Sequence, residues 1–232
     1  MSTRVRLVTA NLALDGGADP AAFARLVEDF AADVVAVQEL GWAQAAALAA
    51  VLPFGRLEPG RAGGRLGIAR RSPGPVTRVP LPSRDGYATD LGLVRRDGHE
   101  ELVEIINVHI VAPHLSPPWR TFSRRRAQLR ALDSHLKTVP NQPRVLVGDL
   151  NATPLWPVYR TLTRRLRDAA LEASRDNGSR PAPTWGPWPG APRLLRIDHA
   201  LVSGLAVHAV RVVPVAGSDH SAIVVDLSLP EF

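Results

Sequence analysis

The sequence predicts an α/β protein in which two β-sheets pack face to face and helices cover their outer faces. Three observations support this fold class. The first part of the chain alternates strand and helix patterns, and the middle part holds strands joined by Pro/Gly or Asp-Gly turns. The chain also carries too many strands for one small sheet. Its 232 residues contain no repeat or low-complexity linker, so we expect one domain over residues 1–232.

Hydrophobic periodicity predicts the elements in order along the chain. In the first part we expect a strand at Val5–Leu14, a helix from Asp19-Pro20 to about Ala32, a buried strand at Val34–Val37 and a helix at Trp42–Leu52. In the middle we expect an antiparallel meander of strands at Leu66–Arg70, Gly86–Arg95 and Leu102–Val111.

The last part of the chain is expected to hold two helices and four strands. The longer helix, at about Trp119–Thr138, carries an apolar stripe of Phe122, Leu129, Leu132 and Leu136. The shorter helix is expected at about Pro157–Leu166, before a Pro/Gly/Trp loop at Arg180–Arg193. The strands are expected at Val145–Val147, Ile197–Val202, Val207–Val213 and Ile223–Leu229.

Composition narrows the class of protein. With 45% hydrophobic and 22% charged residues, the chain has the material for a globular core. Its apolar runs are far shorter than the roughly 20 residues of a membrane span, and its first residues lack a signal-peptide pattern. We therefore expect no membrane span and a cytoplasmic location. The absence of cysteine excludes disulfides and thiolate sites, so any metal must be held by oxygen or imidazole.

The net charge of +6, which comes almost wholly from arginine, suggests an anionic partner. A GC-rich codon supply also favours arginine over lysine, so the positions of the arginines are more informative than their number. They gather in two stretches, Arg120–Arg130 and Arg160–Arg167, which contain few acidic residues. Nothing in the sequence indicates an obligate protein partner.

Several predicted strands are followed or preceded by polar residues of types that bind metal or phosphate. These residues are Asn11, Glu39, His109, Asp149, Asn151, Asp198, Asp219 and His220. Carboxylate and amide oxygens suit Mg²⁺, and amide and imidazole groups suit phosphate oxygens. Each residue alone also has a structural interpretation, such as an Asx turn at Asp149 and Asn151 or a surface carboxylate at Glu39. The recurrence of such residues favours a functional site.

Six short motifs occur in order between Val5 and Leu229. They are Thr9-Ala10-Asn11-Leu12, Val37-Gln38-Glu39, Asn107-Val108-His109, Gly148-Asp149-Leu150-Asn151-Ala152-Thr153-Pro154, Arg196-Ile197-Asp198-His199 and Gly217-Ser218-Asp219-His220-Ser221. Each motif alone is weakly specific, but the ordered set resembles the endonuclease/exonuclease/phosphatase family, which contains DNase I and exonuclease III. The resemblance implies a four-layer α/β/β/α sandwich and a divalent-metal-dependent phosphoesterase.

The resemblance also implies a metal site. Glu39 would be the principal ligand of Mg²⁺ or Mn²⁺, with Asn11 beside it and Asp219 as a further carboxylate. Many nucleases of the family carry an additional Glu, and a Tyr or Arg, between the second helix and the central His. The segment Arg56–Arg96 shows no convincing counterpart, because Glu58 lies in a Pro/Gly loop. We therefore expect no additional metal-binding carboxylate from this segment.

The same resemblance implies the catalytic roles. Asp149 would position and activate the attacking water, while Asn151 and His109 would hydrogen-bond the phosphate oxygens. His220 would donate to the phosphoryl group or move a proton, with Asp198 fixing its ring through the other nitrogen. In-line attack of water then depends mainly on positioning and electrostatics.

Residues in and near the loops indicate which class of substrate the site accepts. Trp185 lies near a motif loop, and Trp119 begins the helix that carries Arg120 and Arg124. Aromatic stacking beside positive charge suits single-stranded nucleic acid, although these tryptophans could instead cap the sheet ends. The favoured function is a nuclease, with Arg120, Arg124 and Trp185 as substrate-binding candidates. The alternatives are a phosphatase of a small phosphorylated metabolite or lipid head group, and a non-catalytic binding protein on the same scaffold.

Overall fold

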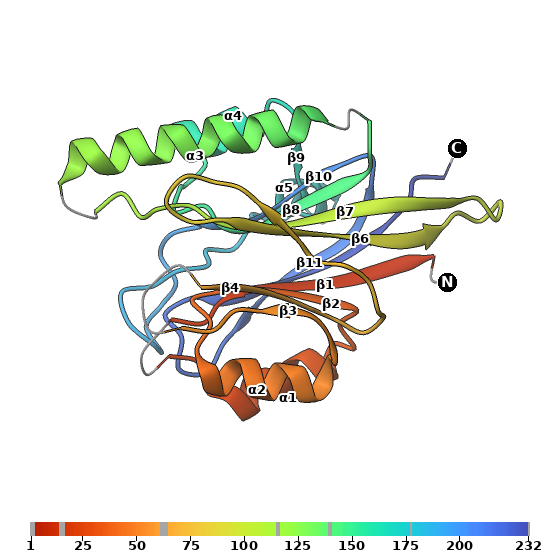
Figure 1. Ribbon diagram of the computed structural model, residues 1–232, viewed down its shortest axis with the longest axis horizontal. Helices are drawn as coiled ribbons and strands as arrows, with labels where there is room; N and C mark the ends of the chain where they lie inside the picture. Colours follow the sequence, from red (N-terminus) through yellow and green to blue (C-terminus); the bar gives the residue numbers. More distant parts are fainter. Residues whose placement is uncertain are drawn as a thin grey trace.

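The computed structural model describes residues 3–13, 17–60, 65–114, 117–138, 141–176 and 178–231. Two six-stranded sheets stack face to face, and helices cover the outer face of each sheet (Figure 1). The four-layer α/β/β/α sandwich expected from the sequence is confirmed. Among the helices of these residue ranges, none combines the length and apolar character that a membrane crossing requires.

The first sheet contains the first and last strands of the chain. Its spatial order is β11 (Ala206–Pro214), β12 (Ser221–Ser228), β1 (Arg4–Asn11), β2 (Val34–Gln38), β4 (Leu66–Arg70) and β3 (Phe54–Leu57). β1 and β2 run parallel, and the other neighbouring pairs run antiparallel. Helices α1 (Pro20–Asp29) and α2 (Trp42–Val51) lie on its outer face (Figure 1). As the sequence predicts, Asp19 caps α1 by accepting a hydrogen bond from the Ala22 amide at 2.8 Å.

The second sheet is built from the middle of the chain. Its spatial order is β5 (Thr77–Val79), β6 (Gly86–Val94), β7 (Glu100–His109), β8 (Arg144–Asp149), β10 (Asp198–Ser203) and β9 (Arg167–Asp168). β7 and β8 run parallel, and the other neighbouring pairs run antiparallel. Helices α3 (Pro118–Thr138) and α4 (Pro157–Leu162) cover its outer face, and α5 (Ala169–Asp176) contacts β10 and β11 (Figure 1).

Three apolar layers hold the four structural layers together. Phe23 and Leu48 pack between the first sheet and its helices, and Ile105 lies between the two sheets. Leu132 and Leu162 pack between the second sheet and its helices. Each such side chain is at most 2% exposed, and burial of a side chain of this size contributes about 1.5–3 kcal/mol.

The meander predicted for the middle of the chain is wrong at its first strand. β4 lies in the first sheet, antiparallel to both β2 and β3, whereas β6 and β7 form a hairpin in the second sheet. Every residue of β4 is buried. A short strand that is buried on both faces is typical of the interior of a sheet, and β4 lies between β2 and β3. The chain crosses to the second sheet only after β4.

The apolar stripe predicted for α3 is correct only toward the end of the helix. Leu132 and Leu136 are buried, but Phe122 is 48% exposed. In the first half of α3 the buried side chains are polar: Thr121, Arg125 and Gln128. This half packs against backbone carbonyls and amides of loops beyond the sheet edge, and such groups need hydrogen-bonding partners.

A buried polar cluster joins the two sheets. The Asn107 amide group on β7 donates to the carbonyl oxygens of Val37 and Gly67 at 3.0 and 2.9 Å. Gln38 on β2 donates to the Asn107 amide oxygen at 2.7 Å and to the Thr9 hydroxyl at 3.1 Å. Because Asn107 and Gln38 are fully buried, these hydrogen bonds fix how the sheets sit against each other.

Candidate active site

The polar residues that follow the strands meet at one edge of the sandwich. β1 and β2 are parallel, so Asn11 and Glu39 leave the first sheet at the same end. In the second sheet, Asp149 pairs with His109 on one side and with Asp198 on the other. The Asn11 side chain donates to Asp149 at 3.1 Å, which connects the two sheets directly at this edge.

A cavity of about 680 Å³ opens at this edge. Its polar wall includes Glu39, Arg84, His109, Asp149, Asp219 and His220. Its apolar wall includes Trp156, Trp185 and Leu195. Residues from both sheets therefore face one space, with ionisable groups beside aromatic rings.

Asp149 is held by three hydrogen bonds at the base of the cavity. Its Oδ1 accepts from the Asn151 backbone amide at 2.7 Å. Its Oδ2 accepts from the side-chain amides of Asn151 and Asn11 at 3.0 and 3.1 Å. Burial and the nearby Asp198 charge outweigh His220 and these hydrogen bonds, and they raise the pKa of Asp149 to about 7. A fixed carboxylate with this pKa can accept a proton near neutral pH.

The two imidazoles of the site have opposite pKa shifts. Asp198 contacts Nδ1 of His220 through both carboxylate oxygens, at 2.9 and 3.1 Å. Burial lowers the pKa of His220, but the surrounding carboxylates of Asp198 and Asp149 outweigh this effect and raise it to about 9. Burial lowers the pKa of His109 well below its ordinary value, and the charges of Arg84 and His220 lower it further. At neutral pH His220 is protonated and His109 is neutral.

Arg84 belongs to the site although the sequence pointed to no arginine in the segment Arg56–Arg96. Its Nη1 lies 3.0 Å from each ring nitrogen of His109. Burial lowers the pKa of Arg84, against the attraction of Glu39 and Asp149. The signal for this placement lies in the pairing of β6 with β7, which sets Tyr87 opposite Asn107 and so brings the start of β6 near His109.

Backbone strain occurs at two residues of the site. Glu39 and Asn151 have φ values of 53° and 48°, in the left-handed region. Asparagine tolerates this region, but for glutamate it costs about 1–2 kcal/mol. At Glu39 this conformation ends β2 abruptly, and the side chain lies in the cavity wall. Such strain is typical of functional sites, where a side chain must point in one direction.

The oxygen donors of the cavity fit a hard divalent cation. Glu39 Oε1 and Asp149 Oδ2 lie 3.8 and 3.5 Å from the same nitrogen, Nε2 of His109. Asp219 is oriented toward the cavity by a 2.9 Å hydrogen bond from the Trp185 indole to its Oδ2. Mg²⁺ binds through one or two carboxylates and keeps several waters, so a wide cavity with few carboxylates suits it.

A second group of ligand atoms lies deeper. Single ligand atoms of Asp149, Asp198 and His220, all buried, lie within 4.8 Å of one another. However, Asp198 and Nδ1 of His220 already contact each other at 2.9 Å, so these atoms serve as each other's partners. The Glu39 side of the cavity is therefore the better site for a cation.

The basic residues predicted to contact substrate lie outside the cavity wall. Arg120 and Arg124 are exposed on α3. Trp185 lies in the cavity wall, as described above. In the second arginine stretch, Arg165 pairs with Asp133 at 2.8 Å and Arg167 with Glu172 at 2.5 Å. Part of that stretch is thus engaged in surface ion pairs, which contribute little to stability.

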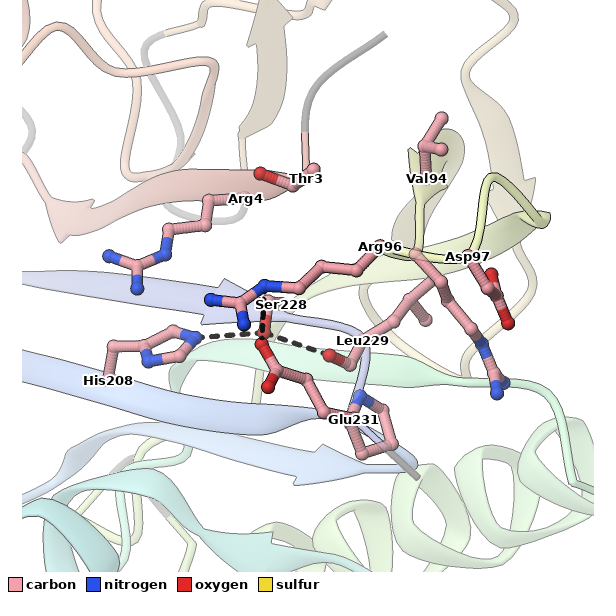
Figure 2. Close-up of a pocket in the computed structure, with 11 residues that line it drawn as sticks. Thr3, Arg4, Val94, Arg96, Asp97, His208, Ser228, Leu229 and Glu231 are labelled. Atoms are coloured by element: carbon pink, nitrogen blue, oxygen red, sulfur yellow. Dashed lines mark hydrogen bonds and ion pairs between the residues drawn. The ribbon is translucent and has the colours of Figure 1, made fainter.

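Another cavity, of about 380 Å³, lies near the beginning of β1 and the end of β12, away from the catalytic motifs (Figure 2). An ion pair at 2.9 Å joins Arg96 and Glu231, and His208 hydrogen-bonds Ser228 at 2.8 Å (Figure 2). None of the residues described for its wall belongs to the six motifs. Motif residues such as Glu39 and Asp149 instead line the 680 Å³ cavity.

A four-layer sandwich with carboxylates and imidazoles gathered between the ends of its two sheets is the DNase I-like fold. Residues 8–220 match the model of the Endonuclease/Exonuclease/phosphatase family. The chain belongs to this family, whose members are hydrolases of phosphate esters.

Solved structures agree with this assignment at the level of the fold. An endonuclease/exonuclease/phosphatase from Beutenbergia cavernae has 23% identity and a TM-score of 0.69, over 97% of this chain and 72% of that chain. The human Nocturnin catalytic domain with bound sulfate has 18% identity and a TM-score of 0.70, over 99% and 96%. A mannosyl-6-phosphatase from Bacteroides thetaiotaomicron has 16% identity and a TM-score of 0.64, over 97% and 100%. No curated protein sequence matches this chain significantly.

Proposed function

We propose that this chain is a divalent-metal-dependent phosphodiesterase that cleaves nucleic acid by in-line attack of water. The main supporting observation is the composition of the 680 Å³ cavity. It joins oxygen donors for a cation, a carboxylate whose pKa is raised to about 7 and an imidazole whose pKa is raised to about 9. Metal-assisted hydrolysis of a phosphodiester uses a cation, a base for the attacking water and a donor to the phosphoryl oxygens.

Each residue then has a role in the reaction. Glu39, Asn11 and Asp219 would hold Mg²⁺ or Mn²⁺, which supplies neutralisation of the charge growing on the phosphoryl and leaving oxygens. Asp149 accepts a proton from the attacking water, and the hydrogen bonds from Asn11 and Asn151 fix the direction of its carboxylate.

The phosphate itself faces three donors. His220 is protonated and donates to a phosphoryl oxygen, while Asp198 keeps its ring in place through Nδ1. Arg84 and His109 lie side by side and bind the remaining oxygens. The side-chain amide of Asn151 already donates to Asp149 and to the Ile110 carbonyl, so a direct bond from it to phosphate requires one of these to break.

Nucleic acid is the proposed substrate because aromatic rings line the cavity and helix α3 exposes a tryptophan and arginines. Trp156 and Trp185 line the cavity. Trp119, at the start of α3, is 73% exposed, and Arg120 and Arg124 on the same helix face solvent. Tryptophan stacks on unpaired bases, and a duplex keeps its bases inside. These features favour single-stranded nucleic acid, with the arginines along its phosphates.

The test is a panel of substrates offered to the purified chain with Mg²⁺ or Mn²⁺: supercoiled DNA, single-stranded DNA, RNA, phosphomonoesters and phosphorylated lipid head groups. The proposal requires strand cleavage that EDTA and Glu39→Ala both abolish. Release of phosphate from monoesters alone would replace it with a phosphatase. Intact substrates throughout, combined with tight binding of nucleic acid, would instead indicate a non-catalytic binding protein.

A further inference from the structure

The first half of helix α3 buries a charged side chain beside the active site. Arg125 is 3% exposed, whereas its neighbours Arg124 and Arg126 face solvent. No ion pair among the described residues includes Arg125. Burial lowers the pKa of Arg125 to about 10, against the attraction of Asp149, so its guanidinium still carries a charge at neutral pH. A buried charge without an ion-pair partner is costly, and its retention calls for an explanation.

The Arg125 guanidinium bonds to two loop carbonyls. Its Nη1 donates to the Val111 carbonyl and its Nη2 donates to the Asn151 carbonyl, the latter at 3.1 Å. One turn further along α3, the Gln128 side-chain oxygen accepts from the Val111 amide at 3.0 Å. The same guanidinium lies over the Trp156 ring, 5.5 Å from its centroid.

These partners follow directly after the catalytic strands. Val111 stands two residues beyond His109 on β7, and Asn151 stands two residues beyond Asp149 on β8. A further hydrogen bond at 3.0 Å, from the Asn151 side chain to the Ile110 carbonyl, joins the two strand ends directly. Arg125 thus spans both loops, and the planar fork of donors of an arginine suits two acceptors that diverge.

We propose that Arg125 is a positioning residue, which holds the ends of β7 and β8, and with them His109 and Asp149, in the geometry that phosphate-ester hydrolysis requires. This inference rests on the proposed function. Arg125 lies in the same arginine-rich stretch as Arg120 and Arg124, but its role here is to hold the loops and not to contact substrate. An apolar residue would fill the space, but it would leave two loop carbonyls without a donor.

The test compares Arg125→Met and Arg125→Lys with the matched control Arg126→Met, which removes an exposed arginine one position away. The substrate is bis(p-nitrophenyl) phosphate, a small diester that cannot reach the surface of α3. We expect Arg125→Met to lower kcat about 100-fold, as a misplacement of about 1 Å does, while KM changes about threefold or less. Arg125→Lys should recover part of kcat, because it restores a donor but not the fork.

Imidazole NMR resonances give a readout that does not depend on activity. The His109 resonance should shift in Arg125→Met and stay in place in Arg126→Met. Wild-type kcat in folded Arg125→Met, or losses confined to KM, would overturn the inference, and so would an unchanged His109 resonance. Should Arg125→Met fail to fold, the same criteria apply to Arg125→Lys. A wild-type chain inactive on every diester would refute the proposed function instead, and the resonances would still decide the role of Arg125.

Discussion

His109 and His220 are both buried at the same cavity, but their neighbours act on them in opposite ways. His220 faces the carboxylates of Asp198, Asp149 and Asp219, which together outweigh the effect of burial on its pKa. His109 faces Arg84 and His220, which add to the effect of burial. Titratable groups whose pKa values are pushed apart in this way take different roles: the protonated His220 can donate a proton, whereas the neutral His109 contributes a hydrogen bond.

The metal and water roles predict the effect of two substitutions. Glu39→Ala and Asp149→Ala should each lower kcat by at least about 100-fold, because they remove a cation ligand and the acceptor of the water proton. Initial rates on a cleaved substrate at saturating Mg²⁺ or Mn²⁺ measure this loss. Circular dichroism should show an unchanged fold. A near wild-type rate in either variant would mean that the roles are assigned incorrectly.

Arg84 provides a second prediction for single residues. Arg84→Met should lower kcat/KM about 10- to 100-fold, because a charged donor to the phosphate is lost. Arg84→Lys should lose less, since it keeps the charge but not the planar fork. Arg78, on β5 and largely exposed, offers the matched control as Arg78→Met. An equal loss in that control would show that overall positive charge, rather than the position of Arg84, matters.

At the scale of helices and strands, the amphipathic helix α1, the alanine-rich helix α2 and the continuous apolar runs of β2 and β8 could be predicted from the sequence. Strands β5 and β9 could not, because three and two residues are too few to show a period. Helix α5 was also not predicted. The candidate site residues that follow predicted strands can be singled out by residue type and order. Arg84 cannot, because it reaches the site through a hairpin register that no local pattern reveals.

Gly148 in β8 allows close pairing of β8 with β7 next to the site. At Gly148, φ is 127°, and an added Cβ would lie 2.0 Å from the Val108 carbonyl oxygen. Gly148→Ala should therefore destabilise the fold by at least about 2 kcal/mol, measured by urea unfolding. Gly98 also has a positive φ, but an added Cβ there meets nothing within 4 Å. Gly98→Ala should cost about 1 kcal/mol, and an equal cost in both variants would exclude the clash as the cause.

At the scale of the whole molecule, the site is divided between the two sheets. Glu39 and Asp219 adjoin strands of the first sheet, whereas His109 and Asp149 belong to the second. Their relative placement depends on contacts across the sandwich: the apolar layer between the sheets, the Asn107 hydrogen bonds and the bond from Asn11 to Asp149. The geometry of the site is therefore a property of the packed sandwich rather than of any one segment.

A buried ion pair behind the site predicts how stability depends on pH. Asp168 lies 2.7 Å from Arg196 and accepts from the Tyr159 hydroxyl at 2.6 Å. Burial would raise the pKa of Asp168, but contacts with His199, Arg196 and Tyr159 outweigh it and hold the pKa below its ordinary value. The resulting stabilisation is fully present above the ordinary aspartate pKa of about 4 and is lost as pH falls through the lowered value.

Asp168→Asn should therefore reduce the free energy of unfolding by about 3 kcal/mol at neutral pH, because Arg196 would stay buried without its partner. The difference from wild type should narrow when urea unfolding is repeated at about pH 3. Asp29→Asn, at an exposed aspartate of α1, is the control. A gap that stays constant between the two pH values would contradict the assigned charge state of Asp168.

The division of the site between two sheets has a consequence for inactivation by heat. A small slide of one sheet over the other would move Glu39 away from Asp149 while the backbone hydrogen bonds within each sheet remain intact. Catalysis is then the most sensitive reporter of sandwich packing. On gradual heating, the rate should fall at a lower temperature than the far-ultraviolet signal of the strands, and cooling from that intermediate range should restore it.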